Sequence, residues 1–402
     1  MVNRKISRLG GISLVVAAAI ALAACSSQGA SPKPSGGTAT LIPIGSSLEL
    51  TGPSASTGIP WSRGVALGVK EANGSNGFLV AGKRYKWDLT QKDDQTDPNQ
   101  AIAQFREFAG NGTKFIFGPS NSSAFKPAFN ALGSAPALVM TASSIANTLT
   151  PQANQALFVT LANGEAAFNA TYAKAVIAKD HPKSVAILLP DDVIGPVFVA
   201  QYTKVFQEEG VKVVLSKTFP PATTNFAPYI NDLKSAKPDM VLTGYLDQWL
   251  QPLMQQSVQA GFTSANWMNT VGTTEPTIAK TAGAIKKVYF PIPVKSVTDT
   301  SDAQTKTFRA LWKSTYGSAP VFNDFNALAY YDPILMLTKA MEKAKTVTDV
   351  AKIAKELPTV TSWPGQASNG SFSTTDHTRL YPVNYGVYGS GKVNYFQVPL
   401  EK

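Results

Sequence analysis

The sequence predicts an α/β protein made of two lobes, each with a parallel sheet covered by helices on both faces. Short apolar runs alternate from Leu41 onward with segments in which apolar residues recur every three or four positions. The strand patterns are separated by helical patterns of roughly 10 to 15 residues, a spacing typical of parallel sheets. The series occurs twice in tandem, and a chain of 402 residues is long enough for two or three domains.

The first series contains two well-marked helix starts. Apolar residues from Trp61 to Ala72 recur at helical spacing, which predicts a helix that begins after Pro60. Asp97 followed by Pro98 is typical of a helix start, because the carboxylate caps free N–H groups and proline fits the first helical position. The other expected elements are strands at 41–44, 85–89, 114–117 and 138–140 and a helix after Ser122.

The second series repeats the same order of elements. Apolar runs predict strands at 184–189, 211–219, 240–243 and 288–291, and helical patterns cover 197–209, 226–235, 248–260, 303–316 and 327–344. Two alternating segments, 385–388 and 393–396, flank Gly389-Ser390-Gly391, which is typical of a β-hairpin. We therefore expect an antiparallel hairpin near the end of the chain.

Composition excludes several classes of protein. Apolar residues make up 44% of the chain and charged residues 15%, which is globular and excludes a disordered, collagen-like or coiled-coil protein. The single cysteine excludes an internal disulfide framework, and two distant histidines make a metal centre or a histidine relay unexpected. The Lys and Arg residues behind the net charge of +10 are spread singly along the chain, so we expect no nucleic-acid partner; mild attraction to an anionic membrane surface is the alternative. We also expect no cofactor.

The first residues predict an exported, lipid-anchored protein. A short basic segment precedes an uncharged, mainly apolar run at 11–24, whose 14 residues would span about 21 Å as a helix. That length is too short for a bilayer core of about 30 Å but fits a signal peptide. Leu22-Ala23-Ala24-Cys25 resembles the bacterial lipobox, which implies lipidation of Cys25. We therefore expect a signal peptide at 1–24, a flexible tether at 25–40 and an extracytoplasmic location at a cell membrane; the alternative is a plain secretory signal with an incidental cysteine.

Two hydroxyl clusters follow neighbouring strands. The segment 118–123, with Ser122, follows a buried strand and opens a helix, so its N–H groups and hydroxyls could hold a small carboxylate. The alternative is a helix cap that binds nothing else. Thr141, Ser143 and Ser144 follow the next strand, and adjacent strand ends of an open parallel sheet face one crevice. Together the two clusters favour a binding site.

Paired acids raise the question of catalysis. Asp93-Asp94 and Asp191-Asp192 could act as an acid and a base in an extracellular hydrolase, but such pairs at strand ends commonly serve as helix caps and ligand acceptors. We therefore expect a binding protein and not an enzyme.

Short motifs occur in a fixed order along nearly the whole chain after the leader. They are Leu50-Thr51-Gly52-Pro53, Arg63-Gly64, Asp93 to Pro98, Phe117-Gly118-Pro119 with Ser122, Leu189 to Asp192 with Gly195, Phe219-Pro220-Pro221, Lys237-Pro238-Asp239, Ala260-Gly261 and Ala329-Tyr330-Tyr331-Asp332. In order and spacing they resemble the bacterial solute-binding proteins of the branched-chain amino acid (leucine/isoleucine/valine) type, which serve ABC importers.

The resemblance implies two Rossmann-like lobes joined by three crossovers, with the ligand enclosed between them by hinge closure. The implied lobes are 41–152 with 293–345, and 153–292 with 346–402. The residues that the resemblance assigns to the ligand are Ser122, Ser143, Ser144, Ile145 and Trp61 from the first lobe and Asp191, Tyr245, Asp247 and Val271 from the second.

Two positions depart from the family pattern. Ile145 stands where amino acid binders have a threonine, and Val271 stands where an acidic residue pairs with the ligand's ammonium. A buried ammonium without a carboxylate would cost several kcal/mol. Either Asp247, Glu275 or Asp191 substitutes, or the ligand is a carboxylate, amide or urea without an α-amine. A hydrophobic amino acid is slightly favoured.

The resemblance also implies the partners. They would be a small-molecule ligand and the permease and ATPase of an ABC importer, with the binding protein acting as a monomer. A ligand-sensing component of a receptor is the alternative, because the same fold serves both roles.

Overall fold

The computed structural model describes residues 38–143, 145–161, 166–244, 247–270, 275–292 and 303–400. The expected signal peptide and Cys25 lie outside these residues. The segment Ala39–Lys402 is one compact unit. Among the described residues, no helix has the length and apolarity needed to cross a bilayer.

The first lobe is built on a six-stranded sheet in the order β2-β3-β1-β4-β5-β6. All neighbouring strands run parallel except β2, which pairs antiparallel with β3. The strands are β1 (Thr40–Leu48), β2 (Phe78–Val80), β3 (Lys83–Asp93), β4 (Phe115–Phe117), β5 (Ala137–Thr141) and β6 (Gln155–Val159). The expected parallel α/β sheet is confirmed.

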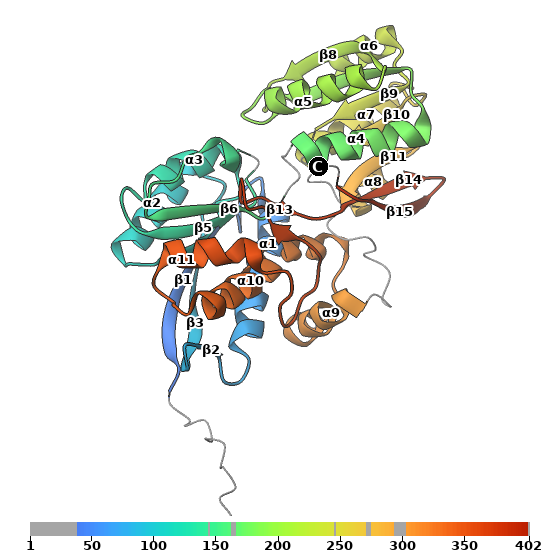
Figure 1. The fold of residues 1–402 in the computed structure, drawn as a ribbon. Helices are drawn as coiled ribbons and strands as arrows, with labels where there is room; N and C mark the ends of the chain where they lie inside the picture. The colour runs from blue at the N-terminus through green and yellow to red at the C-terminus, as the bar shows by residue number, and fades with distance from the viewer. Residues whose placement is uncertain are drawn as a thin grey trace, which may run out of the picture. The chain divides into compact units, whose positions relative to one another are not determined.

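Helices cover both faces of this sheet. In β5, Val139 packs in one apolar cluster with residues of α2 (Pro98–Gly110) and α3 (Ser122–Asn130). Its neighbours Leu138 and Met140 pack in another cluster, with residues of α1 (Ala55–Asn73), α10 (Leu328–Ala344) and α11 (Val350–Glu356). Successive strand residues point to opposite faces, so the buried run predicted for this strand serves both helical layers. Figure 1 shows α11, in orange, beside the green strands β5 and β6, which it contacts although it is distant from them in sequence.

The second lobe is built on a seven-stranded sheet in the order β15-β14-β11-β10-β9-β7-β8. Its strands are β7 (Ser184–Pro190), β8 (Lys212–Phe219), β9 (Met240–Thr243), β10 (Asn266–Asn269), β11 (Val288–Ile292), β14 (Val383–Gly389) and β15 (Lys392–Val398). The first five run parallel, and β14 and β15 are antiparallel additions at one edge. Its helices are α4 (Ala166–Asp180), α5 (Gly195–Glu208), α6 (Ala227–Ala236), α7 (Asp247–Gln259) and α8 (Glu275–Thr281).

The predicted C-terminal hairpin is confirmed. Gly389 pairs with Lys392, so the turn is the two residues Ser390 and Gly391. Both have positive φ, 52° and 74°, a geometry that glycine allows and that matches the twist of the two strands. The hairpin joins the second sheet through the pairing of β14 with β11.

Two segments differ in sheet membership from the implied lobe limits. The strand β6 pairs along its length with β5, so the first sheet extends to Val159, beyond the implied limit at residue 152. Helix α11 lies against α10 and β6, so the chain after residue 345 stays with the first lobe before it reaches β14. An apolar strand pattern predicts a strand but not the sheet that it joins, because pairing partners are set by contacts distant in sequence.

The chain therefore passes between the two sheets three times in the described residues. It leaves the first sheet after β6, returns between β11 and α9 (Ala303–Tyr316), and leaves again before β14. Three crossovers are what the resemblance implied.

Helix α1 begins earlier than the prediction placed it. It starts at Ala55 and contains Pro60, whose missing N–H leaves the carbonyl of Ser56 without a helical donor. Asn323, in the short 3-10 helix η3 (Phe322–Ala327), donates from Nδ2 to that carbonyl at 2.6 Å. A side chain distant in sequence therefore allows the helix to continue through the proline.

Candidate functional site

The candidate site lies where the strand order of the first sheet reverses. After β1 the chain passes through α1 to the strands β2 and β3 at one edge of the sheet. After β4 it passes through α3 to β5, in the direction of the opposite edge. Because α1 and α3 cover opposite faces, the loops after β1 and β4 diverge at the carboxyl ends of these strands. Ligands of open α/β sheets bind at this topological position.

The two predicted hydroxyl clusters meet in the structure. Ser143 donates from Oγ to Ser122 Oγ at 3.0 Å, and both residues are buried. Thr141 Oγ1 donates to the carbonyl of Pro119 at 2.7 Å and accepts from Ser143 N at 3.0 Å. These bonds hold the loop after β4 and the loop after β5 together. Since Ser122 Oγ accepts from Ser143, the hydroxyl hydrogen of Ser122 remains available for a ligand.

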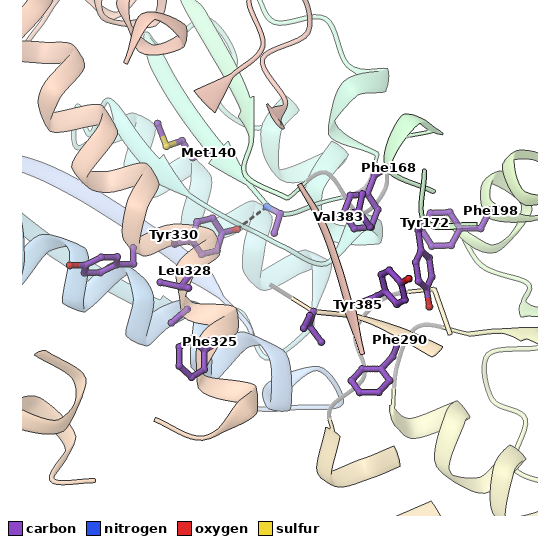
Figure 2. Close-up of a cluster of buried hydrophobic side chains, with 14 of the residues drawn as sticks. Met140, Phe168, Tyr172, Phe198, Phe290, Phe325, Leu328, Tyr330, Val383 and Tyr385 are labelled. Carbon is purple, nitrogen blue, oxygen red and sulfur yellow. Dashed lines mark hydrogen bonds between the residues drawn. The ribbon is translucent and has the colours of Figure 1, made fainter. Parts of the chain in front are cut away.

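Tyr330 of α10 forms hydrogen bonds with both of these loops. Its hydroxyl lies 2.6 Å from Ser120 Oγ and accepts from Ala142 N at 2.9 Å, the bond drawn as a dashed line in Figure 2. Complete burial raises the pKa of Tyr330 well above its usual value, so the hydroxyl stays neutral. Trp61, which the resemblance assigns to the wall of the site, packs edge-on against this ring with the centroids 6.2 Å apart.

The start of α3 is already partly capped by the protein itself. Asn121 accepts from Ser123 N at 3.0 Å through its side chain and donates its own N–H to Glu49 Oε1 at 2.5 Å. Within the described ranges no acceptor is found for Ser122 N–H. The donors that remain for an anion at the predicted site are therefore the amide and hydroxyl of Ser122 and the hydroxyl of Ser143.

Glu49 is a buried acid that sequence reasoning did not single out. It follows β1 directly and is fully buried, and its Oε2 has no hydrogen-bond partner among the described residues. Burial, with a smaller contribution from the charge of Asp94, raises the pKa of Glu49 to about 8. The sequence does carry one signal, since Glu49 is the only charged residue between Thr40 and Lys70 other than Arg63.

The paired acids hold loops in the manner of caps. Asp93 Oδ1 accepts from Leu50 N at 2.9 Å and from Thr51 N at 3.1 Å, and its Oδ2 accepts from Thr51 Oγ1 at 2.7 Å. Partial burial raises the pKa of Asp93, but these hydrogen bonds, with that of the Thr51 hydroxyl the strongest, outweigh burial and lower it. Asp192 Oδ1 accepts from Ile194 N and Gly195 N, both at 2.9 Å, at the start of α5. One acid of each pair, Asp93 and Asp192, therefore caps a loop or a helix start, which fits a structural role for these two residues.

The second lobe has an equivalent strand reversal at β7 and β9. Asp191 follows β7 and is exposed, and Asp247 is the first residue of α7, which follows β9. The remaining predicted residues Tyr245, Val271 and Ser144 lie outside the described residues. Ile145 lies inside them: its N–H is 3.5 Å from Ser143 Oγ and its carbonyl accepts from Thr148 Oγ1 at 2.7 Å.

Metal ligands do not gather in the described part of the chain. No group of three or more His, Cys, Asp or Glu side chains there could hold an ion. The donors described above are hydroxyls and amides, which suit an organic anion or another polar group of a small molecule.

The fold and this arrangement of loops define a class of protein. The family model for periplasmic binding proteins matches residues 41–386, so the chain belongs to that family. The resemblance to the branched-chain amino acid type, with its two-lobed α/β fold, is confirmed.

Particular relatives lie in the same group. The chain is 26% identical over 325 residues, 79% of its length and 82% of the relative's, to the leucine-, isoleucine-, valine-, threonine- and alanine-binding protein of Pseudomonas aeruginosa. A substrate-binding protein of a branched-chain amino acid transporter from Streptococcus pneumoniae, solved with isoleucine, has a TM-score of 0.73 at 18% identity, covering 89% of this chain and 99% of that one. An ABC-transporter solute-binding protein of Rhodopseudomonas palustris, solved with 3,4-dihydroxybenzoic acid, has a TM-score of 0.70 at 20% identity, covering 90% and 98%. At these identities the two structures show the shared fold.

Proposed function

We propose that the protein is the extracytoplasmic, lipid-anchored solute-binding component of an ABC importer. It binds a small amphipathic solute between its two lobes and delivers it to the permease after hinge closure. The observation that carries the proposal is the hydrogen-bonded pair Ser122 and Ser143, which joins two loops at the strand reversal of a periplasmic binding protein. Their hydroxyls and the Ser122 amide hold the ligand's carboxylate.

The ligand is a branched-chain or other hydrophobic amino acid, with an amine-free carboxylate, an amide or urea as the alternative. The Pseudomonas relative supports the first, and the dihydroxybenzoic acid complex supports the second. The two cases differ in whether the second lobe supplies a partner for an ammonium. Valine at position 271 favours the amine-free case, and Asp191 and Asp247 are the acids that would serve an amine.

The remaining parts of the proposal concern the ends and limits of the lobes. Cys25 carries the lipid anchor, and 25–40 is the flexible tether that lets the folded part reach the permease. The permease works with an ATPase, and the binding protein acts as a monomer. Trp61 and Ile145 wall the site from the first lobe, and Ser144, Tyr245 and Val271 complete it. The first lobe comprises 41–159 and the segment from α9 to the short strand β13 (Arg379–Leu380), and the second comprises the intervening chain and the segment from β14 onward.

A ligand panel tests the function. L-Leucine, L-isoleucine, L-valine, 3,4-dihydroxybenzoate and urea are each added to the purified protein while thermal unfolding is followed. A true ligand at about 100 times its dissociation constant stabilises the folded state by about 2.7 kcal/mol, whereas non-ligands leave the midpoint unchanged. Turnover of a small ester or amide would instead support a hydrolase.

A double variant tests the placement of the site. Ser122→Ala with Ser143→Ala removes both hydroxyls and should strongly reduce the stabilisation by a carboxylate ligand. The exposed Ser235→Ala, which removes a hydroxyl that bonds only its own helix, is the matched control. If the double variant binds the ligand as tightly as the natural protein, the carboxylate is held elsewhere.

A further inference from the structure

We propose that Glu49 sets the pH range in which the site accepts an anionic ligand. Its neutral carboxyl admits a carboxylate at the loop 118–123, and its ionised form repels one. The inference rests on the proposed function, because it concerns the same amide and hydroxyl donors. Glu49 contacts the loop and not the ligand, so it is a positioning residue.

The Glu49 side chain lies directly beside the start of α3. Glu49 Oε1 accepts the N–H of Asn121, the residue immediately before Ser122, at 2.5 Å. Helix α1 closes over Glu49 from the other side, since a Cβ added at Gly58 would lie 2.8 Å from the Cβ of Glu49. The carboxyl is therefore fully buried and fixed one peptide unit from Ser122, whose amide and hydroxyl we assign to the ligand.

The groups around Glu49 include one acid and a neutral tyrosine. Asp94, which follows β3, opposes the ionisation of Glu49. Ser47 of β1, two residues before Glu49, donates from Oγ to Asp94 Oδ2 at 3.5 Å. Tyr330 of α10 faces Glu49 with a neutral hydroxyl. Through the described ranges no lysine or arginine forms a salt bridge with Glu49, and helix α1 approaches it with Gly58. A negative charge on Glu49 would therefore be offset only by backbone N–H donors such as that of Asn121, with no cation paired to it beside the anion site.

The protonation state of Glu49 changes between pH 7 and pH 9, and this determines whether affinity for a carboxylate rises or falls with pH. With a pKa of about 8, Glu49 is mostly neutral at pH 7 and ionised at pH 9. The pKa of Asp94 is about 6, raised chiefly by burial, so Asp94 is already ionised throughout that interval. A carboxylate ligand should therefore bind less tightly as the pH rises from 7 to 9. By linkage, binding near pH 8 should take up a proton, because the ligand's charge raises the pKa of Glu49 further.

The experiment is calorimetric titration of the purified protein with L-leucine and with 3,4-dihydroxybenzoate at pH 7, 8 and 9. If only the neutral form binds, affinity at pH 9 is about tenfold lower than at pH 7. Titration at pH 8 in two buffers of different ionisation enthalpy should show net proton uptake. Glu49→Gln, which keeps the acceptor for Asn121 N–H but cannot ionise, should bind equally well at all three pH values once the titration of the ligand itself is subtracted.

Two further variants sharpen the result. Asp94→Asn removes the charge that opposes ionisation, so the fall in affinity should begin at a lower pH than in the natural protein. The exposed Glu107→Gln, which disturbs only the ion pair with Lys92, should keep the natural profile. The Asp94→Asn shift and the proton uptake decide the matter even if Glu49→Gln does not fold.

Contrary results separate the two proposals. Affinity that is constant from pH 7 to pH 9, or that falls equally in the natural protein and Glu49→Gln, overturns the role of Glu49 and leaves the proposed function standing. Failure of every carboxylate to bind at any pH overturns the proposed function, and the role of Glu49 with it.

Discussion

Asp332 of α10 is a buried carboxylate whose hydrogen bonds fasten the segment that leads to β14. It accepts from Trp363 Nε1 and Ala367 N, both at 2.9 Å, and from Ser368 Oγ at 2.5 Å. Arg379 lies 3.5 Å from its second oxygen, and both charged side chains are almost wholly buried. The stretch has few strand or helix bonds of its own, so this one carboxylate organises it.

Removing that carboxylate should destabilise the protein strongly. Asp332→Ala leaves the buried Arg379 guanidinium without its counter-charge and the Trp363 indole N–H without its acceptor, which should lower the free energy of unfolding by about 3 to 5 kcal/mol. Urea denaturation measures the change. The matched control is Glu208→Ala, which breaks an exposed pair with Lys204 and should cost less than about 1 kcal/mol. Equal stability of the two variants would show that the Asp332 network contributes little.

Single residues also mark how far the sequence reveals the site. Ser122 and Ser143 could be predicted because each follows a buried strand, and the rule that parallel strand ends share an edge brings them together. Glu49 and Tyr330 could not, because their roles depend on contacts with Asn121, Ser120 and Ala142 across distant parts of the chain. A pattern of apolar residues shows that a position is buried but not which polar group it meets.

At the scale of elements, helix α1 packs closely against the segment that begins α10. A Cβ added at Gly64 would lie 2.1 Å from the carbonyl oxygen of Ala327, and one added at Gly68 would lie 2.8 Å from that of Tyr331. Real contacts of this kind are more than 3 Å, so the two helices approach as they do only because these positions lack side chains. This contact joins α1, the first helix of the described residues, to a helix that follows the second crossover.

The same substitution at two helical glycines should therefore have opposite effects. Gly64→Ala forces α1 away from η3 and α10 and should lower stability by about 1 to 3 kcal/mol, despite the better helix propensity of alanine. Gly110→Ala, at the end of α2, meets no atom within 4 Å and should be neutral or raise stability by up to about 1 kcal/mol. Thermal unfolding of the two variants compares them directly. A stable Gly64→Ala would mean that the helices separate at no cost.

Local signals predicted the elements that local chemistry determines. The helix start at Asp97 and Pro98 is confirmed because a cap and a proline act within one turn, and the hairpin turn at Ser390 and Gly391 is confirmed for the same reason. The start of α1 was placed too late because Asn323, from another part of the chain, compensates Pro60. The place of β6 in the first sheet likewise depends on its pairing with β5.

At the scale of the whole molecule, three crossovers connect the two sheets and divide each lobe into separate stretches of chain. Connections of this kind let two lobes rotate about short hinge segments while each keeps its own core. A ligand that contacts both lobes favours the closed arrangement, because it has more contacts there than in the open one.

Solution scattering tests this closure. If the ligand is enclosed between the lobes, the radius of gyration should decrease when a ligand found in the panel is added at saturating concentration. The Ser122→Ala, Ser143→Ala double variant at the same ligand concentration should keep the larger value, because it loses the donors that hold the carboxylate. A compound that raises the unfolding temperature of the natural protein without reducing its radius of gyration would show that binding occurs without closure. The proposed delivery mechanism would then be wrong even though the chain binds its ligand.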